Sequence, residues 1–413
     1  MVSSHFISTM SNIVYFNLRA HSTVNSTLGI VQELVRRGEQ VDYYCYEEFR
    51  NKIESVGAQF HQLPANPDLW LDETATPQSA SMETSLEAIP ILLEHFQRDR
   101  PKLLIFNSAC LWGCLLGELL KLPTVATHIH HLVPRRFIPP LPVLLAPNCI
   151  RRFSENPKIV DKHRSLWTQL KQKYQFERVK KNDLFKLMRY MLFFHGDLNI
   201  VFTSETFQIK RENFDSSYVF TGPCYSKSLL EPESCWAKIE GKSVIYISLG
   251  TIFNQNIPFF KKCLQAFGNS QHLVVMTVGN SVDINLLGDI PPNFIVKNFV
   301  PQLEVIKYAS VFIYHGGMQS TLDALTHQVP LVLFPQYSEQ YLTAHRLEEL
   351  GAGIWVKQQN IEPMKLRELV EKVMQDSSIR GNVKRLGKSL VEAGGTQRAV
   401  DKILEFKQQF SRL

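Results

Sequence analysis

Residues 311–340 read VFIYHGGMQSTLDALTHQVPLVLFPQYSEQ, and this stretch decides the fold of the second half of the chain. It opens with a short apolar run and two glycines, continues with apolar residues at helical spacing, and ends in a second apolar run over 329–334. Continuous apolar runs of this length are typical of strands buried in a parallel sheet. The order strand, tight turn, helix and strand therefore predicts a βαβ unit.

The junction between the first predicted strand and the helix carries His315, Gly316 and Gly317. In a βαβ unit this junction lies at the edge of the sheet where ligands bind. Two glycines let a bulky anion approach the backbone, and the start of the helix offers unpaired N–H groups and partial positive charge. Ser320 and Thr321 would add hydroxyl donors. The pattern predicts a phosphate-binding turn.

Glu339 and Gln340 follow the second apolar run, so we expect them at the same edge of the sheet. A carboxylate and an amide suit the hydroxyl groups of a sugar. A purely structural interpretation is also open, in which the glycines only turn the chain and Glu339 and Gln340 only begin a solvated helix. Each motif alone fits both interpretations, whereas their joint occurrence favours ligand binding.

The first half of the chain also alternates short apolar runs with helical segments. Predicted strands over 12–17 and 41–46 flank a helix that ends in a basic pair and Gly38. A second series of strands begins at Val244, after a charged, proline-containing stretch over 223–240 that predicts a linker. The predicted fold class is α/β with two doubly wound domains. The first turn holds no GxGxxG motif, which argues against a dinucleotide oxidoreductase.

Length and composition narrow the class further. A chain of 413 residues is long for one core, so two domains are expected. The net charge of +6 comes without clustered arginine and aromatic motifs, which argues against nucleic acid as a partner. Seven scattered cysteines include no CxxC pair, so we expect no disulfide framework and no structural zinc. Because no signal peptide or long apolar run is seen, we expect a soluble, cytoplasmic protein.

From Asn12 to about Gly353 the chain resembles the UDP-glycosyltransferase family, in particular its bacterial macrolide-type branch. The motifs that carry this resemblance are HGGMQST at 315–321, the turn before the second apolar run, and the Glu-Gln pair. The resemblance implies the GT-B fold, in which two Rossmann-like domains face each other across a cleft. It implies an acceptor-binding domain over 1–222, a linker over 223–240, a nucleotide-sugar-binding domain over 241–395, and a helix over 396–413 that crosses back to the first domain.

The resemblance also assigns roles to donor-binding residues. The HGG motif would hold the diphosphate, the turn over 300–302 the nucleobase, and the Glu-Gln pair the sugar, while Gln319 stands where the family has Asn. No cofactor or metal is implied, since the nucleotide sugar is a co-substrate and a histidine with a helix terminus can stabilise the diphosphate. The implied donor-binding residues are Thr251, Val300, Gln302, His315, Gly317, Gln319, Ser320, Glu339 and Gln340.

The acceptor side departs from the family pattern. Relatives carry the turn Ala-His-Gly-His-Val-Asn-Pro after the first strand, with the second His as general base, whereas residues 20–26 here read AHSTVNS. The position of the base is therefore Thr23, and the position of its Asp partner is Asn107. A threonine does not act as a base near pH 7, and an asparagine does not stabilise an imidazolium.

Three explanations of this departure remain open. Another base can replace the missing one, with His21, His128, His130 and His131 as candidates. The acceptor can be an activated carbon, a nitrogen or an acidic phenol that needs little deprotonation. The chain can also bind its ligands without transferring a sugar.

Two features near the expected acceptor site have alternative interpretations. His128, His130 and His131 either line the acceptor site or are structural. The basic, amphipathic segment over 150–190 either forms a helical hairpin at the acceptor mouth or rests on an anionic membrane.

The leading hypothesis is an inverting glycosyltransferase of natural-product biosynthesis. It would move a sugar from an NDP-sugar, UDP-linked by resemblance, to a small apolar acceptor such as a polyketide, a phenol or an isoprenoid. The alternative is a non-catalytic GT-B homologue that binds a nucleotide, a metabolite or a partner enzyme. A third hypothesis, a nucleotide-sugar epimerase of similar fold, has no acid/base pair to support it.

Overall fold

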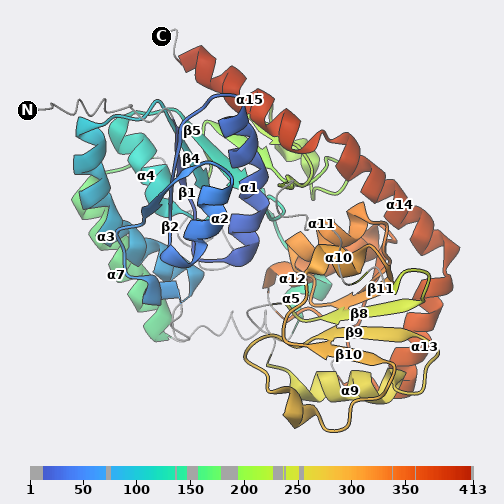
Figure 1. The fold of residues 1–413 in the computed structure, drawn as a ribbon. Helices are drawn as coiled ribbons and strands as arrows, with labels where there is room; N and C mark the ends of the chain where they lie inside the picture. The colour runs from blue at the N-terminus through green and yellow to red at the C-terminus, as the bar shows by residue number, and fades with distance from the viewer. Residues whose placement is uncertain are drawn as a thin grey trace, which may run out of the picture.

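The computed structural model describes residues 13–70, 76–134, 137–146, 157–177, 194–226, 236, 239–250, 255–336, 338–358 and 360–410. Two parallel sheets, each flanked by helices, form two α/β domains (Figure 1). This architecture confirms the predicted fold class. Among the described residues, no helix is long and apolar enough to cross a membrane.

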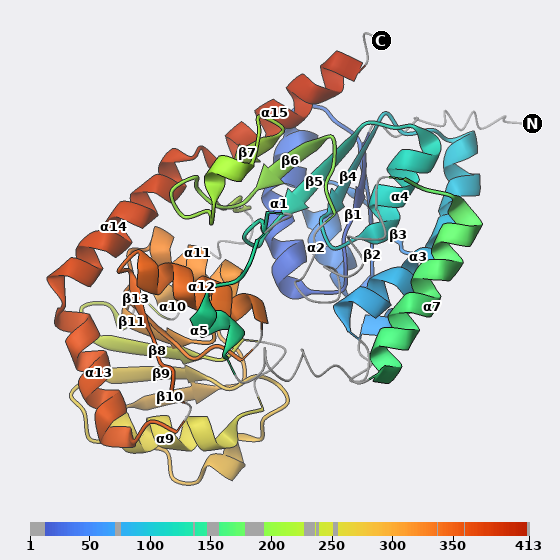
Figure 2. The same cartoon turned by 180° about the vertical axis from the view of Figure 1, so that it is seen from behind.

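The first domain contains a seven-stranded sheet with the order β3-β2-β1-β4-β5-β6-β7, and every pairing is parallel. Its strands are β1 (Ile13–Phe16), β2 (Val41–Cys45), β3 (Gln59–Gln62), β4 (Leu103–Asn107), β5 (Thr124–His128), β6 (Leu198–Val201) and β7 (Tyr218–Phe220). Its helices are α1 (His21–Arg36), α2 (Arg50–Ser55), α3 (Pro77–Arg98), α4 (Leu111–Leu120) and α7 (Pro157–Tyr174), with short 3₁₀ turns η1 (Glu47–Phe49), η2 (Pro67–Trp70) and η3 (Arg211–Asn213). The short helix α5 (Leu141–Leu144) follows β5 in the chain but lies against α12 (Ser338–Glu349) of the second domain (Figure 2).

The second domain contains a six-stranded parallel sheet with the order β10-β9-β8-β11-β12-β13. Its strands are β8 (Val244–Ser248), β9 (Leu273–Thr277), β10 (Phe294–Lys297), β11 (Ala309–Tyr314), β12 (Leu331–Leu333) and β13 (Gly353–Trp355). Its helices are α9 (Ile257–Phe267), α10 (Gln302–Ile306), α11 (Met318–Thr326), α12 (Ser338–Glu349), α13 (Pro363–Gln375) and α14 (Ser377–Glu392), with a 3₁₀ turn η6 (Ile284–Leu287).

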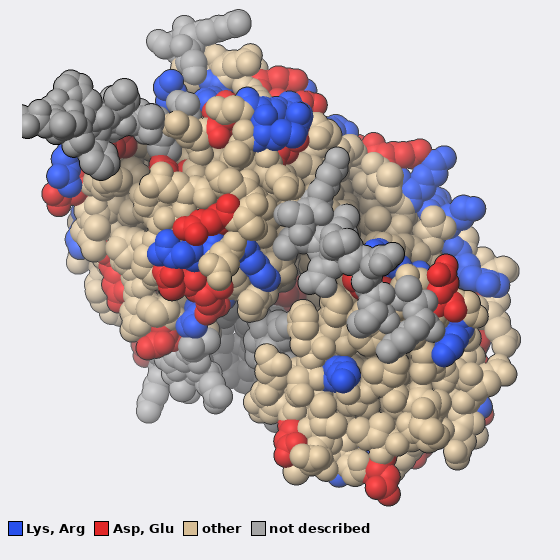
Figure 3. Space-filling model, in the orientation of Figure 1, with Lys and Arg blue, Asp and Glu red and all other residues tan. Residues whose placement is uncertain are grey.

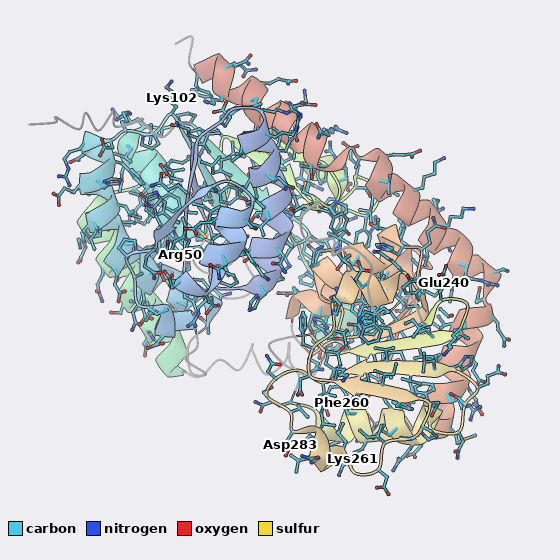
Figure 4. All side chains as sticks on the ribbon, in the orientation of Figure 1. Arg50, Lys102, Glu240, Phe260, Lys261 and Asp283 are labelled. Carbon is cyan, nitrogen blue, oxygen red and sulfur yellow. The ribbon has the colours of Figure 1, made fainter. Side chains whose placement is uncertain are left out.

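The central strands of both sheets are mostly apolar and largely buried on both faces, namely β1, β4, β8 and β11. The central strand β8 is buried throughout, and Tyr246 on it stacks on Phe312 of β11 with 4.6 Å between ring centroids. Such a pair contributes about 0.5–1.5 kcal/mol beyond its buried area. Helix α9 buries Phe260 completely while the next residue, Lys261, is exposed, as Figure 4 labels them. The apolar runs in the sequence therefore became sheet interior, as their composition predicts.

The last helix, α15 (Gly395–Phe410), leaves the second domain and lies against α1 of the first (Figure 1). It buries Ala399, Val400 and Ile403, and its polar side adds an ion pair between Arg37 and Asp401. Exposed ion pairs contribute only about 0–1 kcal/mol, so the apolar side chains are the main source of adhesion.

The described half of the basic 150–190 segment is mostly helix α7, which lies along α3 (Figure 2). Leu166, Trp167 and Leu170 are buried, so the apolar face of this part of α7 is covered by protein. Residues 150–156 and 178–190 lie outside the described residues. Figure 3 shows acidic and basic side chains gathered close together on the first domain. Arg50, labelled in Figure 4, forms ion pairs with Glu47 and Glu54.

Candidate functional site

The donor side of the site is built at the point where the strand order of the second sheet reverses, between β8 and β11. At such a switch point the loops that follow the two strands diverge and leave a crevice for a ligand. Gly250 lies two residues beyond β8, and His315, Gly316 and Gly317 follow β11. The structure thus brings the predicted phosphate-binding turn to a ligand-binding edge. Thr251 lies outside the described residues.

Two glycines make room for the His315 ring. A Cβ atom at Gly250 would lie 2.7 Å from Cε1 of His315, and one at Gly317 would lie 2.5 Å from Nε2. Gly250 and Gly316 also have φ angles of 82° and 90°, which other residues rarely adopt. Burial lowers the pKa of His315 to about 4, with a smaller opposing effect from the backbone of Ser248. The ring is therefore neutral at pH 7, and its contribution to a ligand is hydrogen bonding rather than full charge.

Helix α11 begins directly after this turn, with Gly317 as its N-cap. No side chain caps this end, so its first N–H groups have no intrahelical partners. The hydroxyl of Thr321, expected as a phosphate donor, donates to the carbonyl oxygen of Gly317 at 2.9 Å and also contacts the Tyr314 hydroxyl at 2.6 Å. Because Thr321 is fully buried, that expectation is wrong for Thr321, whose role is to fix the turn.

A buried carboxylate that the sequence did not single out lies beneath the donor side. Asp323 is 3% exposed and accepts hydrogen bonds from Nε2 of Gln302 at 2.7 Å and from Nε2 of Gln319 at 2.8 Å. The hydroxyl of Ser320 in turn donates to Oε1 of Gln302 at 3.1 Å. Three predicted donor-binding side chains are thus tied to one acid. Asp323 follows Gln319 by four residues on the same helix, and this spacing could have indicated that the two side chains interact.

An exposed aromatic side chain that the sequence did not single out precedes the predicted nucleobase turn. Val300 is only 3% exposed, whereas the preceding Phe299 is 70% exposed, and Gln302 opens α10. An aromatic ring with this exposure is a better stacking surface than Val300. An open cavity of about 710 Å³ lies beyond the ends of β9 and β10, lined by Asn280, Ser281, Val282, Asp283, Ile284, Asn285 and Asn298.

Glu339 and Gln340, the predicted sugar-binding pair, lie in the first turn of α12. Oε1 of Gln340 accepts from the backbone N–H of Gln336 at 2.8 Å. Oε1 of Glu339 lies 4.0 Å from Nδ1 of His130, which follows β5 of the first domain. Arg346 on the same helix donates to the backbone carbonyl oxygens of residues 206–208 in the first domain. Helix α12 therefore carries the sugar residues and also joins the two domains.

By resemblance, Thr23 and Asn107 occupy the positions of the general base and its Asp partner in the family. Both are buried, and each hydrogen-bonds to the backbone of its own turn. The Thr23 hydroxyl donates to the carbonyl oxygen of Ala20 at 2.8 Å, and Oδ1 of Asn107 accepts from the N–H of Ala109 at 3.0 Å. Within the described part of the chain, no hydrogen bond joins Thr23 to Asn107. Neither side chain titrates near neutral pH.

The four candidate histidines lie in different environments. His21 is exposed at the start of α1 against the Phe49 ring, and partial burial with nearby Lys52 lowers its pKa. His128 and His131 are almost fully buried, and burial lowers the pKa of each to about 3, which makes them poor bases at pH 7. Nδ1 of the half-buried His130 lies 4.0 Å from Oε1 of Glu339, a predicted donor-side residue.

The described residues contain no group of three or more His, Cys, Asp or Glu side chains that could hold a metal ion. Cys45, Cys110, Cys114, Cys224 and Cys263 are buried and form no disulfide within this part of the chain.

Comparisons with known proteins identify the family of this chain. Residues 261–405 match the family described as erythromycin biosynthesis protein CIII-like, C-terminal domain. NDP-glycosyltransferase YjiC of Bacillus subtilis (strain 168) is 33% identical over 96% of this chain and 98% of its own length. Uncharacterized UDP-glucosyltransferase YojK of the same strain is 30% identical over 97% and 98%. The crystal structure of CalG4, the calicheamicin glycosyltransferase, matches with a TM-score of 0.77 at 25% identity, over 96% of this chain and 98% of that one. The chain therefore belongs to the macrolide-type glycosyltransferases and has their GT-B fold.

Proposed function

We propose that this enzyme is an inverting glycosyltransferase that moves a sugar from an NDP-sugar, preferably UDP-linked, to a small apolar acceptor of the polyketide, phenol or isoprenoid type. The observation that carries the proposal is the turn after β11, at the β8–β11 switch point. There a neutral His315, held between Gly250 and Gly317, stands beside the uncapped start of α11. Support for the donor class comes from the name of YjiC, an NDP-glycosyltransferase.

The residues on the donor side suit the departure of a diphosphate. In an inverting transfer the acceptor oxygen forms a bond to the anomeric carbon while the bond from that carbon to the diphosphate oxygen breaks on the opposite face. The negative charge that grows on the diphosphate would receive hydrogen bonds from the His315 ring and the first N–H groups of α11. Glu339 and Gln340 would hold the sugar hydroxyls.

The proton of the acceptor needs a different route from the one the family uses. Thr23 and Asn107 are neutral and occupied by backbone contacts. We assign the substitute base to His130, because it is half-buried and lies 4.0 Å from Glu339 across the domain boundary. A positioned base accelerates such a step about 10²–10⁴-fold, so an acidic acceptor could also react without one.

The binding-only alternative is less favoured, because the relatives are named for glycosyl transfer and the described donor side departs from the family pattern only at Gln319. The test is calorimetric titration with UDP and with UDP- and dTDP-sugars, followed on the same sample by mass spectrometry of donor hydrolysis and of transfer to a phenol and polyketide panel. Donor binding with sugar loss or transfer supports the proposal. Donor binding without turnover across the panel favours the binding-only alternative, and no nucleotide binding overturns the proposal.

A further inference from the structure

Within the described parts of the chain, the buried acid Asp323 has three hydrogen-bond donors, and all three are neutral. Besides Gln302 and Gln319, the hydroxyl of Tyr225 donates to Oδ1 of Asp323 at 2.9 Å. A carboxylate removed from water is costly unless it is fully hydrogen-bonded. An ionised carboxylate is an acceptor only, so three donors satisfy it well. Each donor that is lost would leave this charge less compensated.

Asp323 fixes which way the two glutamine amides face. The NH₂ group of each amide must point at the carboxylate, so each carbonyl oxygen points away from it. Oε1 of Gln302 accepts from the Ser320 hydroxyl, whereas Oε1 of Gln319 is buried with no hydrogen-bond partner among the described residues. An unpaired buried acceptor at this place is suited to a donor group on a ligand. Asp323 thus sets the orientation of side chains in the proposed donor site.

Tyr225 belongs to the segment that leaves the first domain after β7, and its backbone is held there. Its carbonyl oxygen would lie 2.5 Å from a Cβ atom at Gly29 of α1, and it accepts from the Thr396 hydroxyl of α15 at 3.4 Å. The next residue, Ser226, donates its hydroxyl to Oε1 of Gln32 on α1 at 3.0 Å. The tyrosine is therefore anchored on the first domain while its hydroxyl reaches α11 of the second.

We propose that Tyr225 and Asp323 form an interdomain positioning pair, through which the first domain holds the amides of Gln302 and Gln319 in the geometry that binds the nucleotide. This inference rests on the proposed function, because it needs a nucleotide in the donor site. The pair makes nucleotide affinity depend on contacts of α1 in the other domain. A local or purely structural role of Tyr225 would create no such dependence.

The test is UDP affinity, measured by calorimetry on the full chain without any acceptor. Tyr225→Phe removes one donor from Asp323 and weakens UDP binding about tenfold, the usual loss for one hydrogen bond to a charged group. Gln32→Ala changes only the anchor on α1 and weakens UDP binding about threefold, since part of the constraint remains. Tyr218→Phe, on β7 of the same domain, is the matched control and binds UDP like the wild type.

A pH series adds a second readout. The pKa of Asp323 is raised by burial and held down by its three donors and by nearby His327, and Tyr246 of β8 also faces it. Loss of the Tyr225 hydroxyl raises this pKa further, so UDP binding by Tyr225→Phe fails at a higher pH than in the wild type. Equal thermal midpoints show that the variants are folded, and if Tyr225→Phe does not fold, Ser226→Ala takes its place.

The outcomes separate this inference from the function on which it rests. If both Tyr225→Phe and Gln32→Ala bind UDP as tightly as the wild type, Tyr225 and Asp323 do not form a positioning pair. Weak binding by Tyr225→Phe with unchanged binding by Gln32→Ala makes the tyrosine a local residue and overturns the interdomain part. If the wild type binds neither UDP nor dTDP, the donor site itself is wrong. If the wild type binds UDP but transfers no sugar, the proposed activity is wrong, whereas the inference about Tyr225 and Asp323 is unaffected.

Discussion

Gly317→Ala tests whether the position of the His315 ring governs sugar transfer. Gly317 has a φ of −63°, so alanine fits its backbone, and the change reduces to one added methyl group. That methyl carbon would lie 2.5 Å from Nε2 of His315, and an ordinary contact needs at least about 3.4 Å. The ring must therefore move by about 1 Å.

A shift of this size is large for a group that meets a developing charge. Misplacing a reacting group by about 1 Å can lower the rate about 10²-fold, so we expect kcat/KM for the donor to fall about 10²-fold. The cost in folding stability is smaller, about 1–3 kcal/mol for one extra methyl group in a packed site. Steady-state kinetics and denaturant unfolding measure the two effects separately.

The matched control is Gly381→Ala on α14, where an added Cβ atom meets nothing within 4 Å. Alanine at an exposed helix position stabilises by about 0.5–1 kcal/mol relative to glycine and should leave transfer unchanged. If Gly317→Ala is folded and its kcat/KM lies within about threefold of the wild type, the geometry of His315 does not limit transfer and the reasoning fails.

Two further predictions concern the histidines. His130→Gln keeps a polar side chain beside Glu339 and should lower kcat about 10²–10⁴-fold with little change in UDP affinity. His21→Ala should transfer sugar like the wild type. Equal kcat values in the wild type and both variants would exclude His130 as the base. The folded-state pKa values of about 3 for His128 and His131 and about 4 for His315 lie below the ordinary 6.5, so the unfolded chain binds more protons at acid pH. The stability that these neutral histidines contribute is therefore full above pH 6.5 and is lost as the pH falls toward 4, and urea unfolding of His131→Phe should show a shallower loss of the free energy of unfolding over that range.

The features that could be predicted best from the sequence are those set by residues close together in the chain. The strand-turn-helix order around His315 follows from apolar runs and glycines within a few positions, and the structure has it. The contacts of Asp323 with Tyr225 and of His130 with Glu339 join different domains, so no local pattern could indicate them. From the sequence, the Thr321 hydroxyl is expected to bind phosphate. A hydroxyl at the start of a helix can hydrogen-bond either to its own turn or to a ligand, and only its burial in the structure distinguishes these two roles.

The first sheet explains why Thr23 is not a hidden base. At its own switch point, beyond β1 and β4, the side chains form a neutral network in place of a charged pair. Nδ2 of Asn17 donates to the carbonyl oxygen of Thr23 at 3.2 Å and to the Tyr43 hydroxyl at 2.7 Å, and Tyr43 also contacts the Thr27 hydroxyl at 2.8 Å. A buried network of this kind is stable when each member is satisfied, and it has no need of a charge. A base for the acceptor is therefore expected outside this network, and the domain boundary where His130 lies near Glu339 is our proposed place for it.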